Sequence, residues 1–157
     1  MPERMRRALS SAATTDAPAT IAPLGPIDSV HVEEMDREHE QCASALAELV
    51  KAPTVEAIGR VLAAYTAHFQ HEEALLDQHL YAGVDDAAGF SADKGARTSH
   101  FADHERMLAG IREILSCANA DNVPASEVRR LQSQFEKHAT AYDGGYADRL
   151  SAAIAAQ

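Results

Sequence analysis

The sequence predicts an all-α protein, an antiparallel up-down four-helix bundle preceded by a disordered N-terminal tail. Four long segments repeat apolar residues at steps of three and four, as amphipathic helices do, and no segment has the alternation of a strand. Most connections between these segments are short, which favours neighbouring helices that run in opposite directions. We divide the chain into a flexible tail, residues 1–27, and one bundle domain, residues 28–157.

Length and composition restrict the class of protein. The 157 residues suffice for one domain with a sizeable core, and no apolar run is long enough for a membrane span. A formal net charge of −10 argues against binding to nucleic acid or to an anionic membrane, because both require a basic surface. The two cysteines fit free thiols in a reducing compartment. We therefore expect a cytoplasmic monomer, with a protein partner left open.

The N-terminal tail has the composition of a disordered segment. Four of the six prolines fall within the first 30 residues, where apolar periodicity is weak. Arg4, Arg6 and Arg7 precede a run rich in Ser, Ala and Thr, so a transit peptide is the alternative to plain disorder.

The first two helices are expected on either side of a proline. The first runs from an N-cap at Asp28 or Ser29 to about Lys51. The second runs from an N-cap at Thr54, directly after that proline, to about Leu80. Each carries an apolar stripe that should face the core.

The second half of the chain predicts two more helices after a long polar loop. A short helical turn is expected within this loop, at residues 84–88. The third helix should span about residues 93–118, and the fourth should begin at a cap, Asn122 or Ser126. The pair Gly144-Gly145 should interrupt the fourth helix, with a helical continuation after the kink.

Side chains able to bind metal occur on the apolar stripe of every predicted helix. They are His39, His68, Glu72, His100, His104, His138 and Asp143. Two of the pairs stand four residues apart, hence on one helix face, whereas Asp143 follows His138 by five and overshoots that face by about 140°. We expect the glycine pair to loosen the helix and turn Asp143 inward. Buried imidazoles and carboxylates are costly without a partner, and a metal is the partner that suits them.

The number of donors favours two metal ions. Five imidazoles and two carboxylates are too many for one ion. With both carboxylates and one oxygen bridging, three histidines complete one ion, and two histidines leave the other with an open position for a small ligand. Imidazole and carboxylate without thiolate favour iron, manganese or zinc.

The ordered set of ligands resembles the hemerythrin family, particularly the bacterial single-domain hemerythrins. The segment Met35-Asp36-Arg37-Glu38-His39 is similar to the first-helix motif of the family. His68-Phe69, followed by Glu72-Glu73, is similar to its second motif. The resemblance covers about residues 28–150.

The resemblance implies an oxo- or hydroxo-bridged centre of two iron ions. The residues implied for one iron are His100, His104 and His138. Those implied for the other iron are His39 and His68, and those implied as bridges are Glu72 and Asp143. It further implies reversible O2 binding at the second iron, for storage, transport or buffering, in a protein that is not an enzyme.

The expected O2 pocket is lined by the neighbours of the ligands. These residues are Cys42, Phe69, Phe135 and Ala139. Gln134 and Ala139 replace residues that are often larger in the family, and 27 residues separate Glu72 from His100, which is more than usual. We expect the smaller pocket residues to make oxidation of the oxygenated form faster.

Two other classes of function stay open. The same centre could report O2 or redox state to a partner protein, or act as an enzyme on peroxide, nitric oxide or ferrous iron. Cys42 is read as a small buried apolar residue, with a redox-sensitive thiol as the alternative. His31, His71 and His79 are expected outside the metal centre, and His79 is the strongest outside candidate because it shares the inner stripe.

Overall fold

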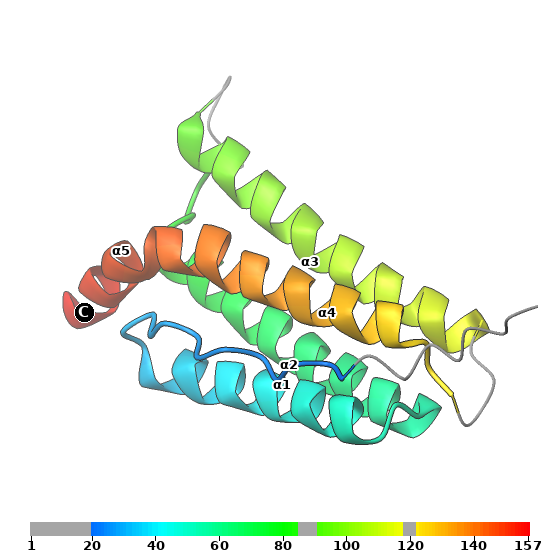
Figure 1. The fold of residues 1–157 in the computed structure, drawn as a ribbon. Helices are drawn as coiled ribbons and strands as arrows, with labels where there is room; N and C mark the ends of the chain where they lie inside the picture. The colour runs from blue at the N-terminus through cyan, green and yellow to red at the C-terminus, as the bar shows by residue number, and fades with distance from the viewer. Residues whose placement is uncertain (1–19, 85–90, 118–121) are drawn as a thin grey trace, which may run out of the picture.

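A computed structural model describes residues 20–84, 91–117 and 122–157. Within these ranges the chain is helical and forms no strand (Figure 1). The elements, in order, are α1 (Glu33–Lys51), α2 (Val55–His79), α3 (Ala92–Cys117), α4 (Ala125–His138), the π-helix η1 (Ala139–Asp143) and α5 (Gly144–Ala155). The prediction of an all-helical protein is confirmed.

The four long helices pack as a bundle around a shared core. Helix α1 contacts α2 and α4, and α3 contacts the same two helices, so the contacts close into a ring. Each helix buries one stripe of its surface, which is the arrangement that its apolar periodicity predicts. None of the helices in the described part of the chain is both long and apolar enough to cross a membrane.

The second and third helices match the sequence prediction closely. Helix α2 begins directly after Thr54, whose Oγ1 accepts a hydrogen bond of 3.2 Å from the backbone N–H of Ala57. This satisfies one of the free N–H groups at the helix start. Helix α3 lies within one residue of the expected range at each end.

The predicted start of the first helix is wrong. Helix α1 begins at Glu33, and neither Asp28 nor Ser29 caps it. The carboxylate of Asp36, in its first turn, accepts hydrogen bonds from Ser29 Oγ at 2.6 Å and from the backbone N–H of Val30 at 2.8 Å. These bonds hold residues 29 and 30 in an extended approach to the helix.

The predicted caps of the fourth helix are also wrong. Pro124 occupies the N-cap position of α4 without a side-chain hydrogen bond, and Ser126 falls inside the first turn. The fixed φ of proline is already close to the helical value, so the helix can begin without a polar cap. Of the helical turn expected over residues 84–88, only residue 84 belongs to the described part of the chain.

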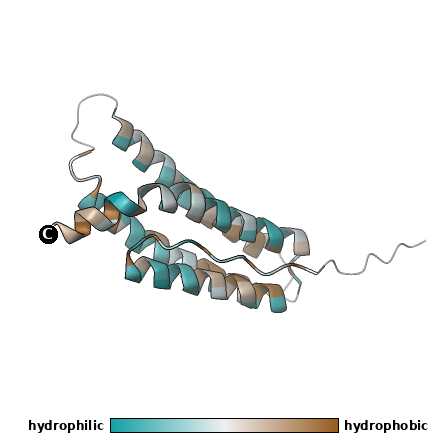
Figure 2. Cartoon of the chain, turned by 60° about the vertical axis from the view of Figure 1, so that its left-hand side comes forward, coloured by the Kyte–Doolittle hydropathy of each residue, from teal (hydrophilic) through white to brown (hydrophobic). Residues whose placement is uncertain are grey.

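An extended segment, residues 20–32, runs along the bundle, and we call it the N-terminal strap. Figures 1 and 2 both show it lying lengthwise beside α1 and α4. Ile21, Leu24 and Ile27 pack against the hydrophobic core, and Gln132 Nε2 of α4 donates a 3.1 Å hydrogen bond to the carbonyl of Ala22. Residues 20–27 of the predicted tail therefore contact the bundle, while residues 1–19 lie outside the described part.

We expect Thr54→Ala to lower the free energy of unfolding by about 1 kcal/mol, because it removes the N-cap of α2. Urea denaturation followed by circular dichroism measures this change. The control is Thr66→Ala, which removes a 2.7 Å hydrogen bond to the Leu62 carbonyl inside the same helix. That bond competes with the helix backbone, so the control should change stability much less.

Candidate metal centre

The seven side chains predicted as ligands are all buried and come together in the bundle interior. Their relative exposures lie between 0% and 3%. They come from α1, α2, α3, α4 and the end of η1. The apolar core of the bundle consists of two clusters. One includes Leu46 and Val61, and the other includes Met35 and Leu150. The polar centre is therefore enclosed by an apolar core.

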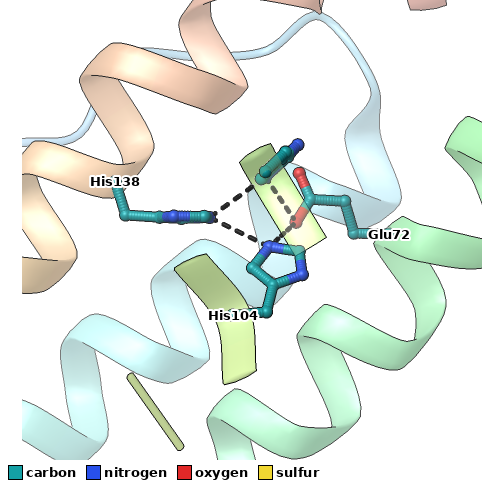
Figure 3. A group of neighbouring side chains, drawn as sticks. Glu72, His104 and His138 are labelled. Carbon is teal, nitrogen blue, oxygen red and sulfur yellow. Dashed lines mark hydrogen bonds and ion pairs between the residues drawn. The ribbon is translucent and has the colours of Figure 1, made fainter. Parts of the chain in front are cut away.

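The donor atoms of these side chains form two groups. The three-histidine group consists of Glu72, His100, His104 and His138, and the two-histidine group consists of His39, His68 and Asp143. Within each group the donor atoms lie within 4.8 Å of one another, a spacing that can hold a metal ion. Figure 3 shows Glu72, His104 and His138 converging from three different helices.

Asp143 lies between the two groups. Its Oδ2 is 3.0 Å from His39 Nε2, and its Oδ1 is 3.2 Å from His138 Nε2 and 3.4 Å from His100 Nε2. One carboxylate thus faces histidines of both groups with different oxygens. This is the placement that a bridging ligand requires.

Glu72 also contacts both groups. Its Oε2 lies 3.0 Å from His104 Nε2 and 3.9 Å from His68 Nε2. Neither carboxylate oxygen of Glu72 has a partner with hydrogen-bond geometry, although both are buried. A fully buried carboxylate without such a partner is costly, so this side chain points to a bound cation.

A π-helix brings Asp143 into the centre, five residues after His138. The wider turn of η1 pairs residue i with i+5, and the backbone N–H of Gly144 donates to the carbonyl of Ala139 in this register. The predicted loosening at Gly144-Gly145 is therefore misplaced, since the irregular turn precedes the glycine pair. A Cβ on Gly144 would lie 3.6 Å from that carbonyl, an ordinary contact, so the turn does not require glycine.

Several buried nitrogen atoms face one another where a metal would lie. His138 Nε2 is 3.3 Å from His100 Nε2 and 3.1 Å from His104 Nε2. His68 Nε2 is buried without a hydrogen-bond partner, as is Asp143 Oδ1. Converging nitrogen and oxygen atoms of this kind are the donors that iron, manganese or zinc accept. The donor set thus fits metal ions.

Burial favours the neutral form of three of these histidines, which is the form that binds metal. It lowers the pKa of His68 and of His100, and it lowers the pKa of His104 to about 2, with His138 and His100 adding to the effect. A metal ligand must be unprotonated, so these shifts favour the binding-competent form.

The two carboxylates of the centre are shifted in opposite directions. Burial raises the pKa of Glu72 well above its usual value, and the nearby charge of Asp143 raises it further. Burial alone would raise the pKa of Asp143 too, but its close contacts with His100, His138 and His39 prevail and lower it. The two carboxylates therefore differ in their affinity for a proton, and a bound cation would favour the ionised form of both.

Three of the histidines have a carboxylate on the ring nitrogen that faces away from the centre. The pairs of Nδ1 and carboxylate oxygen are His68 with Glu38 at 3.2 Å, His104 with Glu73 at 2.8 Å and His138 with Asp103 at 2.7 Å. Such carboxylates fix the orientation of a ligand imidazole and increase its basicity. None of these partners was predicted from the sequence.

The three carboxylates follow a pattern along the chain. Each is adjacent in sequence to one candidate ligand, but it contacts the histidine of the following helix. The carboxylate on α1 contacts a histidine on α2, the one on α2 contacts a histidine on α3, and the one on α3 contacts a histidine on α4. An acidic residue directly beside a ligand was the available signal. Its target could not be read from the sequence, because the contact crosses between helices.

The predicted pocket residues lie close to the centre. Phe69 stacks on His104 with ring centroids 4.0 Å apart, and Phe135 lies edge-on to His39 at 6.1 Å. Cys42 is fully buried in the same apolar cluster, and burial raises the pKa of its thiol. Ala139 is buried at the start of η1. Their contact with O2 remains a prediction.

Gln134 and the remaining histidines occupy other positions. Gln134 lines a cavity of about 140 Å3 beside His138, which belongs to the three-histidine group. The three other histidines have partners outside the centre: Asp148 for His31 at 3.8 Å, Glu38 for His71 at 2.7 Å and Gln157 for His79 at 3.0 Å. The strongest outside candidate, His79, thus lies outside both groups of donors.

We expect Asp103→Asn to weaken metal binding by about 10- to 100-fold, because the amide holds the His138 ring less firmly and makes it a weaker donor. Titration with ferrous iron under anaerobic conditions measures the affinity. The control is Asp77→Asn, which removes a carboxylate of the same kind that pairs with Arg97. Equal affinity in the Asp103 variant and the unchanged protein would contradict the positioning role.

Comparison with known proteins agrees with the geometry of the site. Residues 30–150 match the family model described as the hemerythrin HHE cation binding domain. No curated protein and no solved structure matches the chain. The match covers most of the 157 residues and includes all seven candidate ligands. The chain therefore belongs to the hemerythrin family.

Proposed function

We propose that the protein binds O2 reversibly at a centre of two iron ions, for storage, transport or buffering. The observation that carries this proposal is the unequal number of histidines in the two donor groups, three against two. Family membership supports iron as the metal, and the donor set without thiolate is compatible with it.

The unequal groups imply different coordination of the two ions. With Glu72 and Asp143 shared, the three-histidine ion has five protein donors and the two-histidine ion has four. The three-histidine group would thus surround its ion more completely, and the two-histidine group, with one donor fewer, would leave room for a small ligand. When bound, the iron ions supply the electrons that a reversible O2 complex requires.

The protein's own residues hold and shelter this centre. His39 and His68 come from different helices, α1 and α2, and would hold the second ion between them. Phe69 and Phe135 cover neighbouring ligands with apolar rings, which keeps water away. A histidine-rich set donates less negative charge than the Glu-rich sets of di-iron oxidases, and this favours reversible binding over oxidation of substrates.

The proposal includes the up-down antiparallel order of the helices. Only residues 52–54 join α1 to α2, so these two helices have too little chain between them to run in parallel. Cytoplasmic localisation and a monomeric state also remain proposals. The composition, with two cysteines, supports the localisation only.

The direct test is optical. The protein is loaded with ferrous iron without oxygen, O2 is admitted, and the near-ultraviolet and visible spectrum is recorded before and after O2 is removed. We expect an absorption band that appears with O2 and disappears with its removal. Immediate conversion to a stable ferric spectrum would contradict the carrier function and favour redox sensing or catalysis. His39→Ala should abolish the reversible band, because it removes a donor of the two-histidine group.

We expect the oxygenated form to oxidise within hours or less, because the small side chain of Ala139, a predicted residue of the O2 pocket, would leave room there for water and protons. Replacing it by a larger apolar residue, Ala139→Leu, should lengthen the lifetime of the O2-dependent band. Ala152→Leu is the control, since Ala152 lies in the neighbouring helix α5 with its side chain exposed. An unchanged protein whose oxygenated form lasts for days would refute this expectation.

A further inference from the structure

A cavity beside the metal centre lies between the N-terminal strap and α1. Its volume is about 370 Å3, and strap residues 25–29 form one wall. The other wall is one face of α1. Residues of this face that line the cavity are three or four positions apart: Asp36, His39, Glu40 and Ala43. The strap is held to this face by the two hydrogen bonds that Asp36 accepts from residues 29 and 30.

The cavity meets the metal centre at His39. This histidine is 3% exposed, and its Nε2 points to Asp143 at 3.0 Å. Its other ring nitrogen, Nδ1, is buried without a partner, whereas Nδ1 of His68, His104 and His138 contacts a carboxylate. A buried N–H without an acceptor is costly, so a water or another small molecule in the cavity is the natural partner.

His39 belongs to the two-histidine group, where the coordination position is open. Two other cavities contact candidate ligands, one of about 140 Å3 at His138 and one of about 240 Å3 at His100. Both of those histidines belong to the three-histidine group, whose ion has no free position. Of these three cavities, the one beneath the strap is therefore the one that contacts the two-histidine group.

The residues that line this cavity carry negative charge and no positive charge. Asp28 and Glu40 are exposed at its rim, and Asp36 lies at the attachment of the strap. None of the described residues that line it is a Lys or an Arg. Grouped charges of one sign repel approaching ions of that sign and leave neutral molecules unaffected.

We infer that this cavity is the access route for small ligands to the two-histidine group, and that its acidic rim admits neutral ligands in preference to anions. The inference rests on the proposed function, which places the open coordination position at that group. Asp28 and Glu40 are then specificity-determining residues, because they select ligands without touching the metal.

The first test measures access without any metal. Ala43→Cys is made in the full chain together with Cys117→Ser, so that the introduced thiol is the reactive one; native Cys42 is fully buried. Alkylation by neutral iodoacetamide and by anionic iodoacetate is followed by mass spectrometry. Both reagents attack the thiolate, so the ratio of their rates does not depend on its pKa.

We expect the ratio of the iodoacetamide rate to the iodoacetate rate to be higher at the introduced thiol than at native Cys117 of the unchanged protein. Cys117 is exposed and lies outside this cavity. Glu40→Gln and Asp28→Asn should each reduce the preference by about two- to fivefold. Glu113→Gln removes the same charge from an exposed position on α3, outside this cavity. It should leave the ratio at the introduced thiol unchanged. Equal ratios at the two thiols, no effect of the rim variants or no alkylation would overturn the inference.

The second test uses the iron-loaded protein and Ala43→Phe, which fills the cavity. The inference predicts parallel decreases in the binding rates of neutral O2 and of anionic azide, with unchanged iron content. Glu40→Gln should raise the azide rate and leave the O2 rate unchanged. Unchanged rates in the Phe variant would exclude this route. If the loaded protein failed to bind O2 while the alkylation ratios were as expected, the proposed function would fail and the selective cavity would stand.

Discussion

The structure depends on the burial of seven polar side chains in an apolar bundle. Five imidazoles and two carboxylates occupy the centre of the core at exposures of 3% or less. Without metal, Glu72 has no hydrogen-bond partner and the Nε2 atoms of three histidines face one another. Metal ions convert these unfavourable contacts into bonds, so metal binding and folding of the bundle should be strongly coupled.

The bundle reduces the freedom of the ligands by linking neighbouring helices. Glu38, Glu73 and Asp103 each hold the histidine of the next helix from behind. These contacts make the position of one helix depend on the position of the previous one. The same carboxylates therefore contribute to packing as well as to metal affinity. A change in the metal ions could also be transmitted to the helices through them.

The two sides of the centre have different surroundings. Carboxylates orient His104 and His138 of the three-histidine group and His68 of the two-histidine group, whereas His39 has no partner on its outer nitrogen. The cavity beneath the strap lies on this less constrained side. Under the proposed function, rigid ligands would suit the ion of the three-histidine group, and an accessible ligand would suit the ion at which small molecules exchange. The proposed access route would make the strap, which is outside the four long helices, part of the functional site.

The sequence by itself determined the helical class, the approximate helices and the seven candidate ligands. Apolar periodicity and four-residue spacings are local properties, and they are visible in any stretch of one helix. Thr54 was identified as a cap for the same reason, since its bond reaches only three residues along the chain.

Only the tertiary structure decided the features that depend on contacts between distant segments. The strap contacts α4 through Gln132, 110 positions from its partner Ala22, so its packing could not be inferred from composition. The π-helix arises before the glycine pair. There Asp143 contacts histidines of three helices, α1, α3 and α4. The partners of Glu38, Glu73 and Asp103 are likewise chosen by helix packing. Local spacing identifies which side chains face the core, whereas the fold determines which of them meet.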